Sequence, residues 1–264
     1  MKKINKKLIV PVLFLIVLLA GGVFAFTKFN KPEDATDDRS SKKRITEPVN
    51  VIPVEERPVV YIWPVDSKNL KIEVASLNKP ANQAEYELEY QAGSLLQGAF
   101  DSINLSSVPA TAKIMLGSCS AGGACTYHTD IKGGSLLTRF SGSGDSYALK
   151  ADWKYFENES TMSSKDAKFQ IESTALAKQP YVIIFNGYGY PEGLEGQVVS
   201  DPYTLTTANA ISGKADLTMR ASEEEATNIM GWDGEEWYEF EAEVDGKMLT
   251  AEVDLMQLYV ATKI

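Results

Sequence analysis

The sequence predicts an all-β protein: two tandem antiparallel β-sandwich domains of Ig-like size, behind an N-terminal transmembrane helix and a disordered tether. Three observations support this prediction. A long apolar run lies near the N-terminus, a charged proline-containing segment follows it, and beyond residue 58 short alternating segments are separated by glycine- and serine-rich turns. Such a succession of short strands and turns is typical of antiparallel sandwiches.

The apolar run predicts a membrane span. Residues 1–7 form a basic segment with four lysines, and residues 8–26 contain no charge. At about 1.5 Å per residue the run is roughly 28 Å long, close to the hydrocarbon thickness of a bilayer. Lysines on the leading side favour a cytoplasmic N-terminus and an extracytoplasmic C-terminal part. Because the run exceeds the usual signal-peptide core, we expect a retained signal anchor; secretion after cleavage near Ala25 is the alternative.

The segment that follows predicts a tether. Residues 27–57 are charged, contain several prolines and show no apolar period, which is typical of a disordered linker. The whole chain has a formal net charge of −10, with 44% hydrophobic and 23% charged residues. This composition is ordinary for a globular chain, and the acidic balance makes nucleic acid a poor partner. The membrane, contacted through residues 8–26, is the expected partner surface.

Strand signals beyond the tether fall into two runs of about 100 residues, the usual size of a sandwich domain. The first predicted domain covers residues 58–156, a polar linker covers 157–165, and a second, acidic domain covers 166–264. One larger sandwich is the alternative. The expected strands are 59–63, 85–90, 113–117, 125–131, 136–140, 147–153, 168–171, 181–185 and 215–221, followed by a final hairpin.

The final hairpin is predicted from its turn. Asp245-Gly246 suits a two-residue type I′ turn between two alternating segments. With these two residues as the turn, Phe240 faces Ala251 and Glu239 faces Glu252. The apolar residues of both strands then lie on one face, which supports this register.

The other face of this predicted hairpin gathers carboxylates. Like charges on opposing strands are mildly destabilising, so a divalent cation could relieve them. Carboxylates in the nearby turn Gly231–Trp237 could add oxygen ligands. The candidate calcium ligands are Asp233, Glu235, Glu239 and Glu252. A solvated acidic edge is the alternative, because the spacing of known calcium loops is absent.

Both cysteines and the single histidine lie in the segment "CSAGGACTYH". A Gly-Gly loop allows a tight reversal, which places Cys119 and Cys125 opposite each other at the neck of a hairpin. In an exported protein this arrangement predicts a disulfide. A zinc site built from both cysteines with His128 and Asp130 is disfavoured, because Cys125 and His128 lie on opposite faces of a strand.

Aromatic residues in two loops suggest a binding surface. Tyr188 and Tyr190 lie in the glycine-rich segment "FNGYGYPEG", and Trp232 and Trp237 lie in "GWDGEEW". Loop aromatics on a sandwich can stack on sugar rings, or they can pack and close the ends of the sandwich.

The one match to a catalytic motif, Ser40-x-x-Lys43, lies in the predicted linker and is attributed to chance. We therefore predict no catalytic residues and no cofactor other than the calcium considered above. The expected function is a non-enzymatic, membrane-anchored extracytoplasmic module of the cell envelope for binding or adhesion. Its ligand would be a polysaccharide or an envelope protein. The alternative is an envelope enzyme such as a glycosidase, which would use paired carboxylates.

Overall fold

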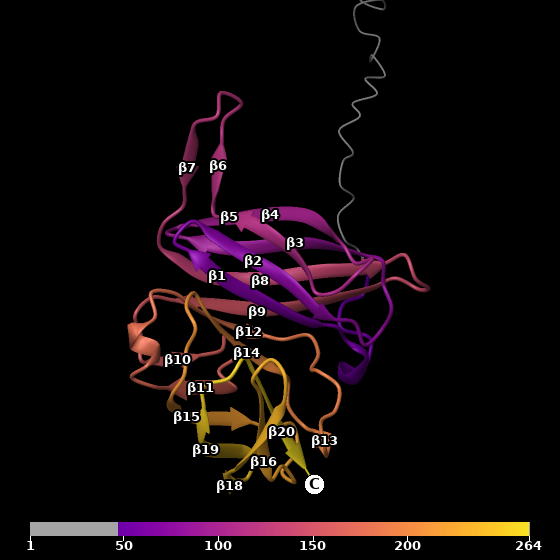
Figure 1. Ribbon diagram of the computed structural model, residues 1–264, viewed down its shortest axis with the longest axis vertical. Coiled ribbons are helices and arrows are strands. Elements are labelled where there is room, and N and C mark those ends of the chain that lie inside the picture. Colours follow the sequence, from indigo (N-terminus) through magenta and orange to yellow (C-terminus); the bar gives the residue numbers. More distant parts are fainter. Residues whose placement is uncertain (1–46, 264) are drawn as a thin grey trace, which may run out of the picture. The chain divides into compact units, whose positions relative to one another are not determined.

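The protein is all-β, as predicted. The structure, a computed structural model, describes residues 47–263, and the predicted anchor at 8–26 lies outside these residues. One large antiparallel sheet runs through the described part of the chain, with two smaller sheets packed against it (Figure 1). Two short 3₁₀ helices are present among the described residues: η1 (Val54–Glu56) precedes the first strand, and η2 (Leu176–Lys178) connects two strands.

The large sheet, called the central sheet below, has ten strands, all antiparallel. Its spatial order is β17 (Trp237–Glu241), β16 (Asn228–Trp232), β20 (Leu258–Lys263), β14 (Tyr203–Thr207), β12 (Val182–Asn186), β9 (Tyr147–Phe156), β8 (Ile131–Ser141), β3 (Gln83–Ala92) and β4 (Leu95–Asn104), with β13 (Gln197–Val198) beside β20. The shortest junction along this path joins β14 to β20, where only Tyr203 and Thr204 pair with Tyr259 and Leu258.

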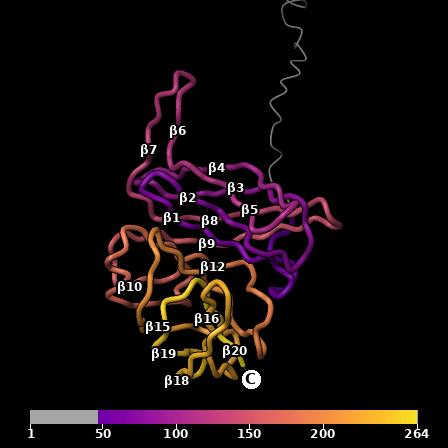
Figure 2. The backbone as a smooth tube through the Cα atoms, in the orientation of Figure 1, coloured from indigo at the N-terminus to yellow at the C-terminus, as the bar shows by residue number. Residues whose placement is uncertain are grey.

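Two smaller sheets cover opposite faces of the central sheet. The first contains β1 (Val59–Asp66), β2 (Asn69–Ser76) and β5 (Ala110–Met115). The second contains β10 (Thr161–Ser163), β11 (Phe169–Glu172), β15 (Lys214–Arg220), β19 (Met248–Asp254) and β18 (Glu243–Asp245). In the tube view the N-terminal and C-terminal halves occupy opposite ends of this unit (Figure 2).

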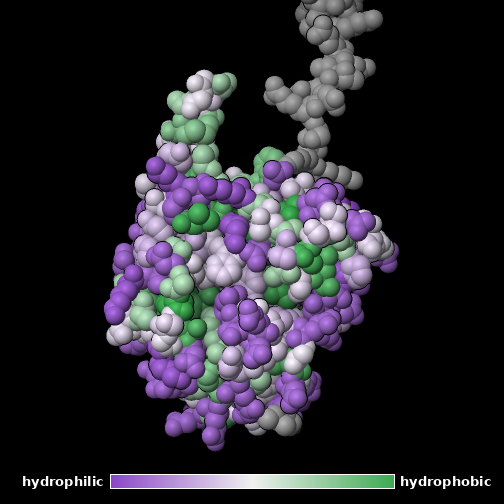
Figure 3. Space-filling model, in the orientation of Figure 1, coloured by the Kyte–Doolittle hydropathy of each residue, from purple (hydrophilic) through white to green (hydrophobic). Residues whose placement is uncertain are grey.

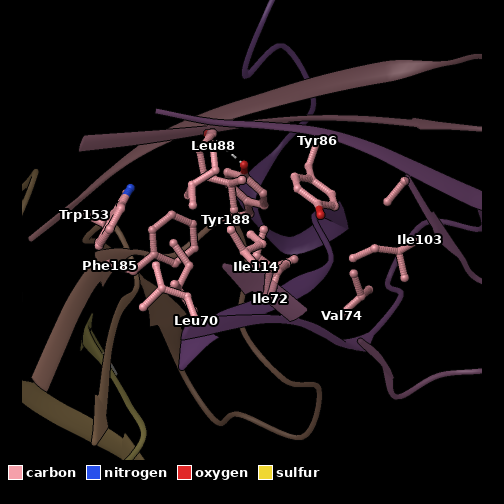
Figure 4. Close-up of a cluster of buried hydrophobic side chains, with 14 of the residues drawn as sticks. Leu70, Ile72, Val74, Tyr86, Leu88, Ile103, Ile114, Trp153, Phe185 and Tyr188 are labelled. Atoms are coloured by element: carbon pink, nitrogen blue, oxygen red, sulfur yellow. Dashed lines mark hydrogen bonds between the residues drawn. The ribbon is translucent and has the colours of Figure 1, made fainter. Parts of the chain in front are cut away.

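Strand β12 explains how the two halves are joined. Its side chains alternate between two cores: Ile183 and Phe185 pack in the first core, under the first small sheet, and Val182 and Ile184 pack in the second core, under the second small sheet. Because both faces of β12 are buried, its sequence is a continuous apolar run rather than an alternating one. Figure 4 shows Phe185 within the first core, near Leu70 and Trp153 (Figure 4). The face of the central sheet that lies under the first small sheet is called the first face below.

The predicted break at 157–165 therefore does not separate two independent sheets. Strand β9 precedes the break and β12 follows it, and the two strands pair directly, with Tyr155 opposite Ile183. The segment 157–165 itself contains β10, which belongs to the second small sheet. The two sandwich halves share the central sheet.

The tether prediction extends too far at its C-terminal end. Residues 47–57 are described and are fixed to β9 by Asn50, whose backbone N–H donates to the Ala148 carbonyl (2.9 Å). The Asn50 side chain also bonds both backbone groups of Lys150. Arg139 pairs with Glu47 and with Glu85, which holds the Arg139 pKa above its ordinary value. Polar composition alone does not reveal such specific pairing.

The predicted pairing of the last hairpin is wrong. The turn is Gly246-Lys247, with Asp245 opposite Met248, and Gly246 has a φ of 59°. A positive φ at the first central residue suits a type II′ turn. Upstream, the chain changes sheets at Ala242, because β17 pairs with β16 and only β18 pairs with β19. Apolar and acidic residues keep alternating across Ala242, so the sequence pattern does not reveal that the chain changes sheets there.

Candidate functional site

The predicted disulfide is confirmed. Strands β6 (Gly117–Cys119) and β7 (Cys125–Tyr127) form a separate two-stranded sheet in which Cys119 pairs with Cys125, and the two sulfurs are bonded. This hairpin projects from the central sheet as an arm (Figure 1). Figure 3 shows the arm mainly in pale and green shades, in keeping with its uncharged residues (Figure 3). A two-stranded ribbon is marginally stable alone, so the disulfide fixes the shape of the arm.

His128 has a structural role at the base of this arm. Its Nδ1 lies 2.9 Å from the Tyr90 hydroxyl, and its backbone N–H donates to the Leu116 carbonyl at 2.9 Å. Asp130, the fourth residue of the disfavoured zinc site, pairs with Lys132 at 2.6 Å. Within residues 47–263 no group of three or more histidine, cysteine, aspartate or glutamate side chains is placed to hold a metal ion.

The two loop tyrosines pack into the fold. Tyr188 is 1% exposed, and its hydroxyl donates to the Leu136 carbonyl at 2.9 Å (Figure 4). Burial raises the pKa of Tyr188 well above its ordinary value. Tyr190 is partly buried, and its carbonyl accepts a hydrogen bond of 3.0 Å from the Asn78 side chain. The structure thus places Tyr188 as a packing anchor rather than as a ligand-binding residue.

The two loop tryptophans form a pair. Trp232 ends β16 and Trp237 begins β17, and they occupy directly opposed positions of this antiparallel pair, so their side chains lie on the same face. Their ring centroids are 5.4 Å apart and the ring planes are inclined by 57°. Both indoles are partly exposed. Met230 and Glu239, the next pair on this face, continue the surface.

This pair lines a cavity of about 670 Å³, which we call the indole pocket. It lies on the first face of the central sheet, over β16, β17 and β20. The first small sheet reaches this end only through its edge strand β1, whose Val59 and Tyr61 pack beside Met230. The lining residues are Glu192, Gly193, Glu195, Gly196, Met230, Trp232, Glu235, Glu236, Trp237, Glu239 and Thr262.

The loop between β12 and β13 forms one wall of the pocket. Gly193 and Gly196 have φ values of 85° and 87°, which glycine adopts without strain. A Cβ atom at Gly196 would lie 2.9 Å from the Lys263 carbonyl oxygen, so the loop passes close to β20. The Trp237 indole N–H donates to the Glu192 carbonyl at 3.3 Å and ties this loop to β17.

A tight turn forms the opposite wall. The Asp233 carboxylate accepts hydrogen bonds of 2.8 Å from the backbone N–H groups of Glu236 and Glu235. These two bonds hold the pKa of Asp233 below its ordinary value. The turn fixes the backbone of Glu235 and Glu236 immediately before Trp237, so their carboxylates line the indole pocket.

The four candidate calcium ligands are not brought together. Glu235 and Glu239 line the indole pocket, and the Oδ1 atom of Asp233 accepts the two turn hydrogen bonds. Glu252 lies on β19 in the second small sheet, where it is opposite Asp216 rather than Glu239. Glu252 therefore does have a like-charged residue opposite it, but this residue is Asp216 and not the predicted Glu239. The predicted pair does not form because β17 and β19 belong to different sheets.

The lining of the indole pocket is acidic and contains neither lysine nor arginine. Lys263 lies next to Thr262 at the pocket, but its ammonium group is held by Glu223 at 2.6 Å and Glu225 at 3.2 Å. These contacts raise the pKa of Lys263. Sequence reasoning missed Glu192 and Glu195, whose only local signal is the glycine spacing of "EGLEG" beside the aromatic loop.

No family model, no curated protein and no solved structure matches the chain. Within residues 47–263 there is no helix with the length and apolar character needed to cross a bilayer.

Proposed function

We propose that the protein is a non-enzymatic binding or adhesion module of a cell envelope, which binds a polysaccharide in the indole pocket. In this proposal residues 8–26 anchor the chain in the membrane, and a linker beginning at residue 27 carries the two sandwich halves outside it. The observation that supports the proposal is the pair of partly exposed indoles in one cavity. Flat aromatic faces pack against the apolar faces of sugar rings, and carboxylates accept hydrogen bonds from sugar hydroxyls.

The character of the carboxylates favours binding over hydrolysis. A glycosidase requires one carboxyl that stays protonated at working pH, usually because it is buried among apolar side chains. All five glutamates that line the indole pocket are exposed. A solvated set of carboxylates is suited to accepting hydrogen bonds rather than to general acid catalysis.

Replacing Trp232 or Trp237 with alanine is expected to weaken binding of the full chain to its polysaccharide by about tenfold or more, since a loss of 1.4 kcal/mol corresponds to a factor of ten. Tryptophan fluorescence titration against a panel of soluble polysaccharides measures this effect. The matched control is Tyr127→Ala: Tyr127 lies on β7 of the arm, is 41% exposed and is not among the residues that line the pocket. Equal affinities for the parent chain and both tryptophan variants would contradict the proposal.

The anchor is tested separately. Membrane fractions of cells that produce the full chain are expected to retain it, with residues 47–263 accessible to protease from outside. A soluble product whose N-terminus is Phe26 would contradict the anchor and leave export intact.

A further inference from the structure

The indole pocket presents an unbalanced set of hydrogen-bonding groups. Five glutamates supply carboxylate oxygens, and a carboxylate can only accept hydrogen bonds. One of these oxygens, on Glu239, already accepts a bond from the Asn228 side chain. The five glutamates are exposed, so water or a ligand supplies the donors for their remaining carboxylate oxygens. A ligand rich in O–H or N–H groups therefore fits the lining better than one rich in carbonyls.

Donors on the protein side are few. Among the lining side chains only the Thr262 hydroxyl and the two indoles carry an N–H or O–H group. The Trp237 N–H is engaged by the Glu192 carbonyl at 3.3 Å. A peptide backbone carries one N–H donor and one carbonyl acceptor per residue, so most of its carbonyls would find no side-chain donor in this lining. A sugar chain presents chiefly hydroxyl groups, each of which can donate.

The charge of the lining adds a second requirement. Five carboxylates share the cavity, and no lysine or arginine among residues 47–263 forms an ion pair with any of them. Anionic polysaccharides are repelled by such a surface, whereas a bound ammonium group reduces the repulsion between the carboxylates. The faces of the two indoles attract the same cations through their quadrupoles.

We propose that the indole pocket selects an amine-bearing polysaccharide, namely a chain of hexosamine units with free, protonated amino groups. The ring faces pack on Trp232 and Trp237, the hydroxyls donate to the glutamates, and the ammonium groups balance their charge. This inference rests on the proposed polysaccharide-binding function and names its ligand class. The cavity and the indole pair define the site, and the carboxylates set its charge preference.

Three hexasaccharides with the same β-1,4 backbone test the inference, because they differ only at C2: a glucosamine hexamer, an N-acetylglucosamine hexamer and cellohexaose. Affinities for the full chain are measured by calorimetry at about pH 6, above the ordinary glutamate pKa of about 4.3. The glucosamine hexamer is expected to bind at least tenfold tighter than the other two. This advantage is expected to shrink severalfold between about 0.02 M and about 0.5 M salt, because screening weakens exposed charge interactions.

A charge-matched pair of variants locates the effect. Glu235→Gln with Glu236→Gln removes two charges from the pocket, and Glu172→Gln with Asp216→Asn removes two from adjacent strands of the second small sheet. Only the first variant is expected to lose most of the tenfold advantage. If both variants lose the same share of the glucosamine hexamer's affinity advantage, this advantage comes from the net charge of the protein, and the inference is overturned.

The remaining outcomes separate the inference from the function on which it rests. If the three hexamers bind with equal affinity and Trp232→Ala abolishes this binding, the amine preference is overturned and polysaccharide binding is left intact. Binding to none of the hexamers or panel polysaccharides contradicts both. A lysine hexapeptide that binds as tightly as the glucosamine hexamer would show selection by charge alone and overturn the sugar assignment.

Discussion

Replacing Phe185 with alanine is expected to lower the midpoint of a single cooperative unfolding transition by roughly 10 °C. Phe185 is fully buried in the first core, and a Phe→Ala change in a core costs about 3–5 kcal/mol. For a unit of this size each kcal/mol shifts the midpoint by roughly 2–4 °C. Calorimetry of the full chain measures the midpoint and shows whether the transition is two-state.

Ile184 makes this experiment specific for the shared sheet. Ile184 is the neighbour of Phe185 on β12, yet its side chain packs in the second core. Ile184→Ala is expected to lower the same transition, since such a change costs about 2–5 kcal/mol. The control Val244→Ala alters a half-exposed side chain on β18 and should leave the midpoint nearly unchanged. Two separate transitions, each sensitive to only one of the two core variants, would contradict the shared sheet.

Gly134→Ala is expected to destabilise the unit by about 3 kcal/mol, and the midpoint should fall by roughly 6–12 °C. Gly134 lies in β8, next to a bulge where Gly133 has a φ of 100°. A Cβ atom at Gly134 would lie 2.8 Å from the Tyr90 Cα and closer still to the Glu89 carbonyl oxygen. Both contacts are with backbone, so relief requires β3 and β8 to separate.

Gly98→Ala is the matched control in the same sheet. Its added Cβ atom would meet only the Leu88 carbonyl oxygen, at an ordinary 3.6 Å. Alanine also loses less conformational entropy than glycine on folding, so this variant should melt at or slightly above the parent temperature. Thermal melts of the two variants measure the difference. Equal midpoints for Gly134→Ala and Gly98→Ala would refute the claim that β3 passes too close to Gly134 for a Cβ atom.

The features that could be predicted from the sequence are those set by neighbouring residues. Tyr86, Leu88 and Tyr90 alternate with polar residues and are buried on one face of β3, as expected. The disulfide followed from a six-residue separation across a glycine loop. Gly133 and Gly134 show the limit of this reasoning, because they resemble a turn in sequence and occupy a bulged strand in the structure.

Features that depend on distant segments could not be predicted. The pairing of β9 with β12 joins residues on either side of a polar break, and nothing in either strand specifies its partner. The indole pocket was foreseen in part: Trp232 and Trp237 were candidates, but the loop that brings Glu192 and Glu195 beside them follows a different strand. Tyr188 belonged to the same composition pattern and is buried instead. Residue type indicates which groups can bind, and tertiary packing decides which are exposed.

The short junction between β14 and β20 has a mechanical consequence for the central sheet. The chain enters the unit at β9 through Asn50, and the indole pocket lies at the β16–β17 end of the same sheet. A force applied to the central sheet between these two places crosses it from strand to strand, along the interstrand hydrogen bonds. The narrowest section on that route is the pairing of Tyr203 and Thr204 with Tyr259 and Leu258. When the central sheet is pulled between these two places, its weakest pairing is the β14–β20 junction.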